Sequence, residues 1–134
     1  MSALSDYLEN ALIDHIFRNS TFSRPANIYI ALFTAAPSDS GGGTEVSGGS
    51  YARQAVATGA SSGWDAASGG ATANTSTVTF PTATANWGTI THIGLFDASS
   101  AGNLLFHGAL TASKVVNSGD IFRINAGDLD ITLA

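Results

Sequence analysis

The side chains that could perform chemistry in this chain are few, and the histidines come first. His92 and His107 fall on consecutive expected strands joined by a turn, so they should lie close to opposite one another. Such a pair could bind a metal ion, and one histidine per chain could do so across a trimer axis. Because cysteine is absent and no carboxylate is spaced to complete the shell, we favour a hydrogen-bonded or solvent-facing pair. His15 should be an ordinary, partly exposed residue of a helix.

Carboxylates give a second possibility for catalysis. Asp128 and Asp130 share one face of the last expected strand and could act as an acid and a base, but a solvated outer face is the favoured interpretation. The sequence contains no nucleophile elbow G-x-S-x-G, no phosphate-binding G-x-x-x-x-G-K-[ST], no H-E-x-x-H and no D-x-D-x-D-G calcium loop. We therefore expect a protein that is not an enzyme, with no catalytic residue, no cofactor and no metal.

Five residues in or beside loops are candidate contacts with a partner: Glu45, Tyr51, Arg53, Trp64 and Trp87. A tryptophan on a loop can bind a sugar or anchor an interface, but closing the end of a core is its more frequent role. Glu45 and Arg53 could form a salt bridge that fastens the return of a glycine-rich stretch, or they could contact a partner. An exposed pair of this kind contributes only about 0–1 kcal/mol to stability.

The stretch from Pro37 to Ala52 joins two expected strands and is rich in glycine and serine. A loop of this length in a compact chain is usually functional or disordered. It offers no reactive chemistry, and we expect none of it to be buried. We interpret it as a displayed segment that lies against another surface, which favours assembly or binding over catalysis.

The composition also favours a protein packed against neighbours. Charged residues make up 11% of the chain, against about 25% in a typical soluble domain, and the formal net charge is −5. A surface of small neutral residues has little desolvation cost to overcome, so we favour assembly over a weakly charged monomer. Five basic residues cannot build a stripe for nucleic acid or an anionic membrane. No apolar run suits a membrane span or a secretory signal.

Only the first segment has the periodicity of a helix, which we expect over about residues 3–18. Ser2 or Ser5 can cap it, and Asp6 and Glu9 lie favourably near its positive end. Its opposite face is polar, so the helix has one apolar stripe, which could lie on its own domain or on a neighbour. The stripe consists of Leu4, Tyr7, Leu8, Ala11, Leu12 and Ile16.

Beyond Pro25 the apolar period changes from 3.6 to 2, and strands are expected from about residue 27 to residue 133. The segment 27–34 is apolar on both faces, which indicates a central strand. Turn sequences at 99–102 and 117–120 predict two hairpins, and Leu133 should point inward with the other leucine and isoleucine of the last strand. The pattern predicts one domain over residues 1–134, mainly β: an antiparallel β-sandwich, jelly-roll-like or Ig-like, with one N-terminal helix.

Several strings of the sequence carry a resemblance to a known family. LFTAAPSDSGGGTEVSGGSYARQAV is followed by WGTITHIGLFDA and then by GNLLFHGAL, in a chain that runs from LSDYLENALIDHIF to DLDITLA. Together and in this order they resemble small bacteriophage structural proteins described as phage tail fibre proteins. The resemblance implies a virion component that is made in the bacterial host cytoplasm, non-enzymatic, mostly β and multimeric.

Three functions are compatible with these expectations. We favour a homo-oligomeric tail fibre or tail-appendage component, a trimer or another homo-oligomer, which contacts other virion proteins of the tail or capsid and a host-surface glycan. The alternative is a capsid cement (decoration) protein bound to the major capsid protein through its helix or the segment 37–50. A carbohydrate-binding or carbohydrate-cleaving tail module is less favoured, because no pair of carboxylates in a groove is visible. The chain lacks the repeats of a fibre shaft, so it would be a tip, an adaptor or a decoration.

Overall fold

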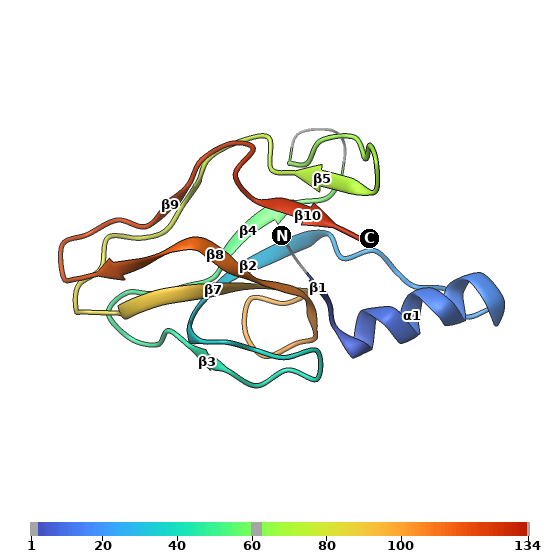
Figure 1. Cartoon of the computed structure of the whole chain (residues 1–134), viewed down its shortest axis with the longest axis horizontal. Helices are drawn as coiled ribbons and strands as arrows, with labels where there is room; N and C mark the ends of the chain where they lie inside the picture. The colour runs from blue at the N-terminus through green and yellow to red at the C-terminus, as the bar shows by residue number, and fades with distance from the viewer. Residues whose placement is uncertain (1–2, 60–62, 134) are drawn as a thin grey trace.

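The computed structural model describes residues 3–59 and 63–133. The chain is mainly β with one helix near the N-terminus, as predicted (Figure 1). The helix is α1 (Asp6–Phe17), and the strands are β1 (Ala3–Leu4), β2 (Asn27–Ala35), β3 (Thr44–Glu45), β4 (Gln54–Ala57), β5 (Ala71–Ala73), β6 (Val78–Thr79), β7 (Gly88–Phe96), β8 (Leu104–Val116), β9 (Arg123–Ile124) and β10 (Asp130–Thr132).

The main sheet is antiparallel and has the order β1-β8-β7-β2-β3. Strands β3 and β4 both pair with the edge of β2 that faces away from β7. Strand β4 pairs with Asn27–Ile30, and β3 pairs further along β2 with Phe33 and Ala35. The apolar segment predicted as a central strand is indeed interior: Ile30, Ala31, Leu32 and Phe33 are all buried. Side chains alternate between the faces of a strand, so β2 contributes apolar groups to both faces of the sheet.

A second layer covers one face of the main sheet and makes the arrangement sandwich-like. It consists of two short antiparallel pairs, β10 with β5 and β6 with β9. The core lies between the layers, with Ile30 and Leu32 of the sheet facing Ile124 and Ile131 of the second layer. Other buried members of this core are Val46, Val78, Phe80, Ala83, Trp87, Ile90, Leu95, Val116, Phe122 and Leu129.

Helix α1 begins at a buried cap and then leaves the body of the protein (Figure 1). Ser5 is 1% exposed; its hydroxyl accepts a hydrogen bond from the Leu8 N–H at 3.2 Å and donates one to the Leu104 carbonyl. Asp6 and Glu9 lie in the first turn, where the helix dipole favours them. The helix ends before Asn19, which has a left-handed φ of 56°. Leu8 is its one buried residue.

The second expected hairpin is wrong in its pairing. The turn at 117–120 exists, but residues 114–116 pair with the start of β7, and β9 pairs with β6 in the other layer. The chain therefore changes layer at this turn instead of folding back on itself. The change of layer buries Phe122 and Ile124 in the core between the layers. Burial of these apolar side chains stabilises this arrangement relative to a local hairpin.

Two expectations about burial are also corrected. The segment 37–52 is not wholly displayed, because Val46 is 6% exposed and belongs to the core, and β3 pairs with β2. Leu133 does not point inward; it is 57% exposed, since β10 ends at Thr132. Its inward-facing neighbours Leu129 and Ile131 are buried as expected.

Candidate functional site

A cluster of Glu45, Tyr51 and Arg53 fastens the glycine-rich segment to the main sheet. Arg53 donates from Nε to Glu45 Oε2 at 2.9 Å and from Nη2 to Glu45 Oε1 at 2.8 Å. The Tyr51 hydroxyl donates to Glu45 Oε2 at 2.6 Å. The Arg53 side chain is only 7% exposed, so this bidentate pair is largely buried rather than a surface salt bridge. We call these three residues the clamp.

Arg53 also joins the clamp to the turn that follows β7. Its Nη1 donates to the carbonyl of Ala98 at 3.0 Å and to that of Ala101 at 2.9 Å. Its guanidinium lies 3.7 Å from the centroid of the Phe96 ring. A planar group with several donors can make these contacts together, whereas a lysine ammonium could not reproduce them.

Tyr51 fills a gap at the edge of β2. The β4 partner residues end opposite Ile30 and the β3 partners begin opposite Phe33, which leaves the Leu32 N–H without a strand partner on that side. The Tyr51 hydroxyl accepts this hydrogen bond at 3.0 Å. The ring stacks with Phe80 and meets Trp87 edge-on, so the clamp is continuous with the core.

The clamp shifts two pKa values in opposite directions. Burial raises the pKa of the Glu45 carboxyl, but the hydrogen bonds from Arg53 and Tyr51 and the charge of Arg53 outweigh it, so this pKa lies below its ordinary value. Burial, with the hydrogen bond to Glu45, raises the pKa of the Tyr51 hydroxyl far above its ordinary value. The clamp is therefore most stable with Glu45 charged and Tyr51 neutral.

Stability should consequently fall at both ends of the pH range. Folding lowers the pKa of Glu45, so its contribution to stability is complete above the pKa of the unfolded state and is lost as the pH falls through the lower pKa of the folded state. The contribution should therefore begin to decline below the ordinary glutamate pKa of about 4.3. An acid whose pKa is raised stabilises fully below its unfolded pKa, so the Tyr51 contribution should decline above about pH 10. Urea midpoints at fixed protein concentration would measure both. Glu45→Gln should weaken the acid dependence and Tyr51→Phe the alkaline one; unchanged pH profiles would contradict the assignment.

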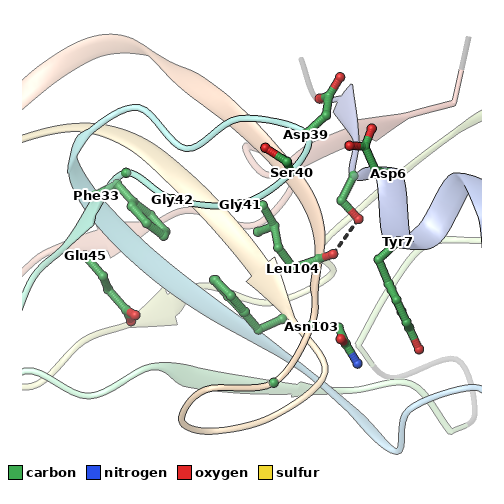
Figure 2. A pocket seen from close by; sticks show the side chains of 14 residues that line it. Asp6, Tyr7, Phe33, Asp39, Ser40, Gly41, Gly42, Glu45, Asn103 and Leu104 are labelled. Atoms are coloured by element: carbon green, nitrogen blue, oxygen red, sulfur yellow. Dashed lines mark hydrogen bonds between the residues drawn. The ribbon is translucent and has the colours of Figure 1, made fainter.

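Beside the clamp, on the face of the sheet away from the core, is a pocket of about 540 Å³ (Figure 2). Phe33 and Phe96 contribute their rings to it, 6.2 Å apart and nearly parallel. Gly94 makes room for both, because a Cβ there would lie 2.8 Å from Phe33 Cε1 and 3.1 Å from Phe96 Cε1. The other lining residues are Ser5, Asp6, Tyr7, Asp39, Ser40, Gly41, Gly42, Gly43, Glu45, Gly102, Asn103 and Leu104.

Two of the three carboxylates that line this pocket, those of Glu45 and Asp39, have partners in the chain, and the third, that of Asp6, lies in the first turn of the helix. Glu45 is held by the clamp, and Asp39 Oδ1 lies 2.7 Å from Nε2 of His107. The predicted histidine pair is offset, since His107 pairs with Gly94 and His92 with Ala109. Among the described residues, no group of three or more histidine, cysteine or acidic side chains could hold a metal. Asp128 and Asp130 are both exposed.

The two tryptophans occupy different environments. Trp87 is 6% exposed, and its Nε1 donates to the carbonyl of Gly49 at 2.9 Å. Gly49 has a φ of 59°, and a Cβ there would lie 2.9 Å from Trp87 Nε1, so glycine is required at this contact. Trp64 is half-buried, and its Nε1 is buried without a hydrogen-bond partner among the residues that the structure describes.

Trp64 lines an apolar groove at the end of the sandwich, which we call the end groove. Its volume is about 300 Å³, and none of its lining residues is charged. It lies between the start of β2 and the β5–β10 pair, with Leu133 exposed at its margin. The main apolar lining residues are Ile28, Trp64, Leu95, Phe106, Ile131 and Leu133.

The second apolar surface is on the segment that projects from the body, residues 5–26, which we call the arm. Its helix exposes Ile13, Ile16 and Phe17, which are 55%, 68% and 78% exposed. The return segment folds against the helix, with the Phe22 N–H donating to His15 Nδ1 at 3.1 Å and the Ser20 N–H to the Asp14 carbonyl at 3.2 Å. In Figure 1 the helix extends away from the sheet and lies apart from β5 and β10.

A comparison with protein families identifies the group to which this β-rich chain with its projecting arm is related. The family model described as Podophage GP4 fiber I protein gp80 matches residues 3–132, almost the whole chain. The chain belongs to this family. The resemblance to phage tail fibre proteins is thereby confirmed, and the family name indicates a fibre-type structural protein of a phage virion. A search of curated proteins found no match.

For this member of the fiber I family, the structure separates the five candidate contact residues. Glu45, Tyr51 and Arg53 come together in the clamp, Trp87 lies in the core, and Trp64 lines the end groove. Sequence reasoning missed Phe96 and the exposed face of the arm. Ile13 and Phe17 could have indicated that face, because both are apolar and lie outside the expected stripe.

Within the described residues no helix has the length and hydropathy of a membrane span.

Proposed function

We propose that this protein is a non-enzymatic component of a phage tail fibre that works as a homo-oligomer, a trimer or another closed assembly. Membership of the fiber I family supports the location on a fibre.

The observation that carries this proposal is the apolar face of the arm. Ile13, Ile16 and Phe17 are more than half exposed on a helix that has only its first turn packed against the body. Large exposed apolar groups gathered on one element mark sites of protein–protein contact. A free monomer would hold these three side chains in water, which is unfavourable by about 25 cal/mol for each square ångström left uncovered.

The use of charge in the chain supports a structural role. Arg53 and Glu45 neutralise one another in the clamp, and the Asp39 carboxylate contacts His107. A general acid or base needs to reach a substrate proton, and these groups are already engaged in contacts that hold the chain together. The clamp thus serves to keep the glycine-rich segment on the sheet.

Two measurements test the proposal. Size exclusion with light scattering should give a whole-number multiple of the 13.6 kDa chain, and a monomer at high concentration would contradict the homo-oligomer. Gold-labelled antibody on intact particles should decorate the tail fibres. Label spread over the head would instead support the capsid cement function, and cleavage of a polysaccharide by the purified protein would contradict the non-enzymatic role.

A further inference from the structure

We propose that the turn at residues 38–41 is a strap that fixes the direction in which the arm leaves the body, and that the contact between Asp39 and His107 is its latch. This gives a conformational role to a histidine whose position in the sequence suggested a metal ligand. The proposal concerns the orientation of the arm within one copy of the chain, so it holds whether or not copies assemble.

The strap is a tight turn with a narrow base. The backbones of Ser38 and Gly41 exchange two hydrogen bonds of 2.9 Å, which places Asp39 at the tip of the turn. At the base, Gly43 has a φ of 76°, and a Cβ there would lie 2.7 Å from the Pro37 nitrogen, so glycine is required. The strap lines the pocket of about 540 Å³ and has open space beside it rather than packed side chains. A contact at its tip is therefore needed to keep it in one position.

Asp39 makes the contacts that join the strap to the rest of the chain. Its carbonyl accepts a hydrogen bond from the Asp6 N–H at 2.9 Å, and its Oδ1 lies 2.7 Å from Nε2 of His107. In the part of the chain that the structure describes, no other hydrogen bond links the strap to residues outside the glycine-rich segment. The His107 side chain is only 14% exposed, so it offers a fixed point to the more exposed Asp39. Asp6 is the first residue of α1, so the strap holds the start of the helix (Figure 2).

The other attachments of the helix leave its direction free. The Ser5 N–H and hydroxyl donate to the carbonyls of Leu105 and Leu104, and Leu8 is the one buried residue of the helix. These anchor points on β8 are neighbours, so the helix could tilt about them. The return segment of the arm is held elsewhere, at the start of β2. The Asp39 carbonyl belongs to a different segment from β8, and a bond to this further point prevents the tilt. An element held in one orientation loses less entropy when it makes a contact.

Hydrogen exchange at two neighbouring amides tests the latch. In Asp39→Ala the Asp6 amide should exchange about fivefold faster or more, because the strap no longer holds its carbonyl in place. The Ser5 amide donates to β8 and not to the strap, so its exchange rate should change by less than about twofold. Equal acceleration of both amides would indicate a general loss of stability and would overturn the proposal, as would no acceleration of the Asp6 amide.

A double-mutant cycle tests whether Asp39 and His107 act as one unit. His107→Ala should accelerate exchange at Asp6 as much as Asp39→Ala does, and the double variant should go no further, because either substitution already removes the contact. His107→Gln, whose amide nitrogen can still donate to Asp39, should restore most of the protection. Additive effects in the double variant would mean that the two residues act separately, and this assignment of the latch would be wrong.

Two spin labels measure the direction of the arm. The chain has no cysteine, so Ile16→Cys and Ser118→Cys place one label on the exposed face of the arm and the other on the exposed turn after β8. Labelled chains are diluted with unlabelled protein, so that only distances within one copy are measured. The distance distribution should broaden when Asp39→Ala is added. Arg18→Ala, which breaks an exposed ion pair within the arm, is the matched control and should leave the distribution unchanged. An unchanged distribution in Asp39→Ala would overturn the strap, because the arm would then keep its direction without it.

Discussion

Replacing Arg53 with alanine should lower the free energy of unfolding by about 2–4 kcal/mol, because a largely buried charge pair loses one member. The Glu45 carboxylate would keep only Tyr51 as a donor, and the carbonyls of Ala98 and Ala101 would lose their bonds to the guanidinium. Urea unfolding at one protein concentration, followed by tryptophan fluorescence, measures the change. Arg53→Lys should recover only part of it, because an ammonium cannot bind the carboxylate in the bidentate geometry.

Arg18→Ala is the matched control for this experiment. Arg18 pairs with Asp14 at 3.7 Å on the surface of the helix, and their side chains are 76% and 48% exposed. An exposed pair at this spacing contributes about 0.3–0.5 kcal/mol. If Arg53→Ala were no more destabilising than Arg18→Ala, the clamp would not be holding the glycine-rich segment.

Replacing Phe80 with alanine should cost about 3–5 kcal/mol of stability, because it creates a cavity at the centre of the core. Phe80 is 1% exposed, stacks on Tyr51 at 6.2 Å between ring centroids, and meets Phe122 edge-on at 5.7 Å. Its loss would also remove the ring that packs against Tyr51, which is one of the three clamp residues. The same urea titration measures the effect.

Ile121→Ala serves as the comparison for the Phe80 variant. Ile121 is 37% exposed and precedes the buried Phe122. A partly exposed aliphatic side chain should cost about 1 kcal/mol or less when it is truncated. Equal losses for the two variants would mean that Phe80 does not have the central position in the core that its burial indicates.

The sequence pattern predicted the elements better than their pairing. The apolar strand at 27–34 and the end of the helix were predicted nearly at their observed bounds, because local chemistry determines them. The helix was expected from about residue 3 but begins at Asp6, because Ala3 and Leu4 pair with β8 as strand β1. The turn at 117–120 was also correct, but whether a chain folds back or crosses to another layer after a turn depends on distant partners. Here β6 supplies the partner of β9, more than 40 residues earlier in the sequence, and periodicity alone could not reveal it.

The candidate site was predictable to a similar extent. The Glu45–Arg53 pair follows from opposite charges on either side of a glycine-rich stretch, and it is present. Its burial was not foreseen, because it depends on Phe96 and on the carbonyls of the turn at 97–103, which only the fold brings next to Arg53. The sequence left open whether the apolar stripe of the helix is covered by its own domain or by a neighbour, because periodicity shows which residues share a face but not what packs against them. It missed Ile13 and Phe17, which lie outside that stripe and are exposed.

The attachment of the arm has a mechanical consequence. Its return segment leads directly into β2, which is bonded to β7 over Tyr29–Phe33 on one side and to β4 over Asn27–Ile30 on the other. Hydrogen bonds between antiparallel strands run perpendicular to the strand axis. Tension applied through the arm along β2 would therefore strain these bonds together, in shear, instead of opening them one after another. Strands whose hydrogen bonds are loaded together withstand a larger force than strands whose hydrogen bonds break one at a time from the end.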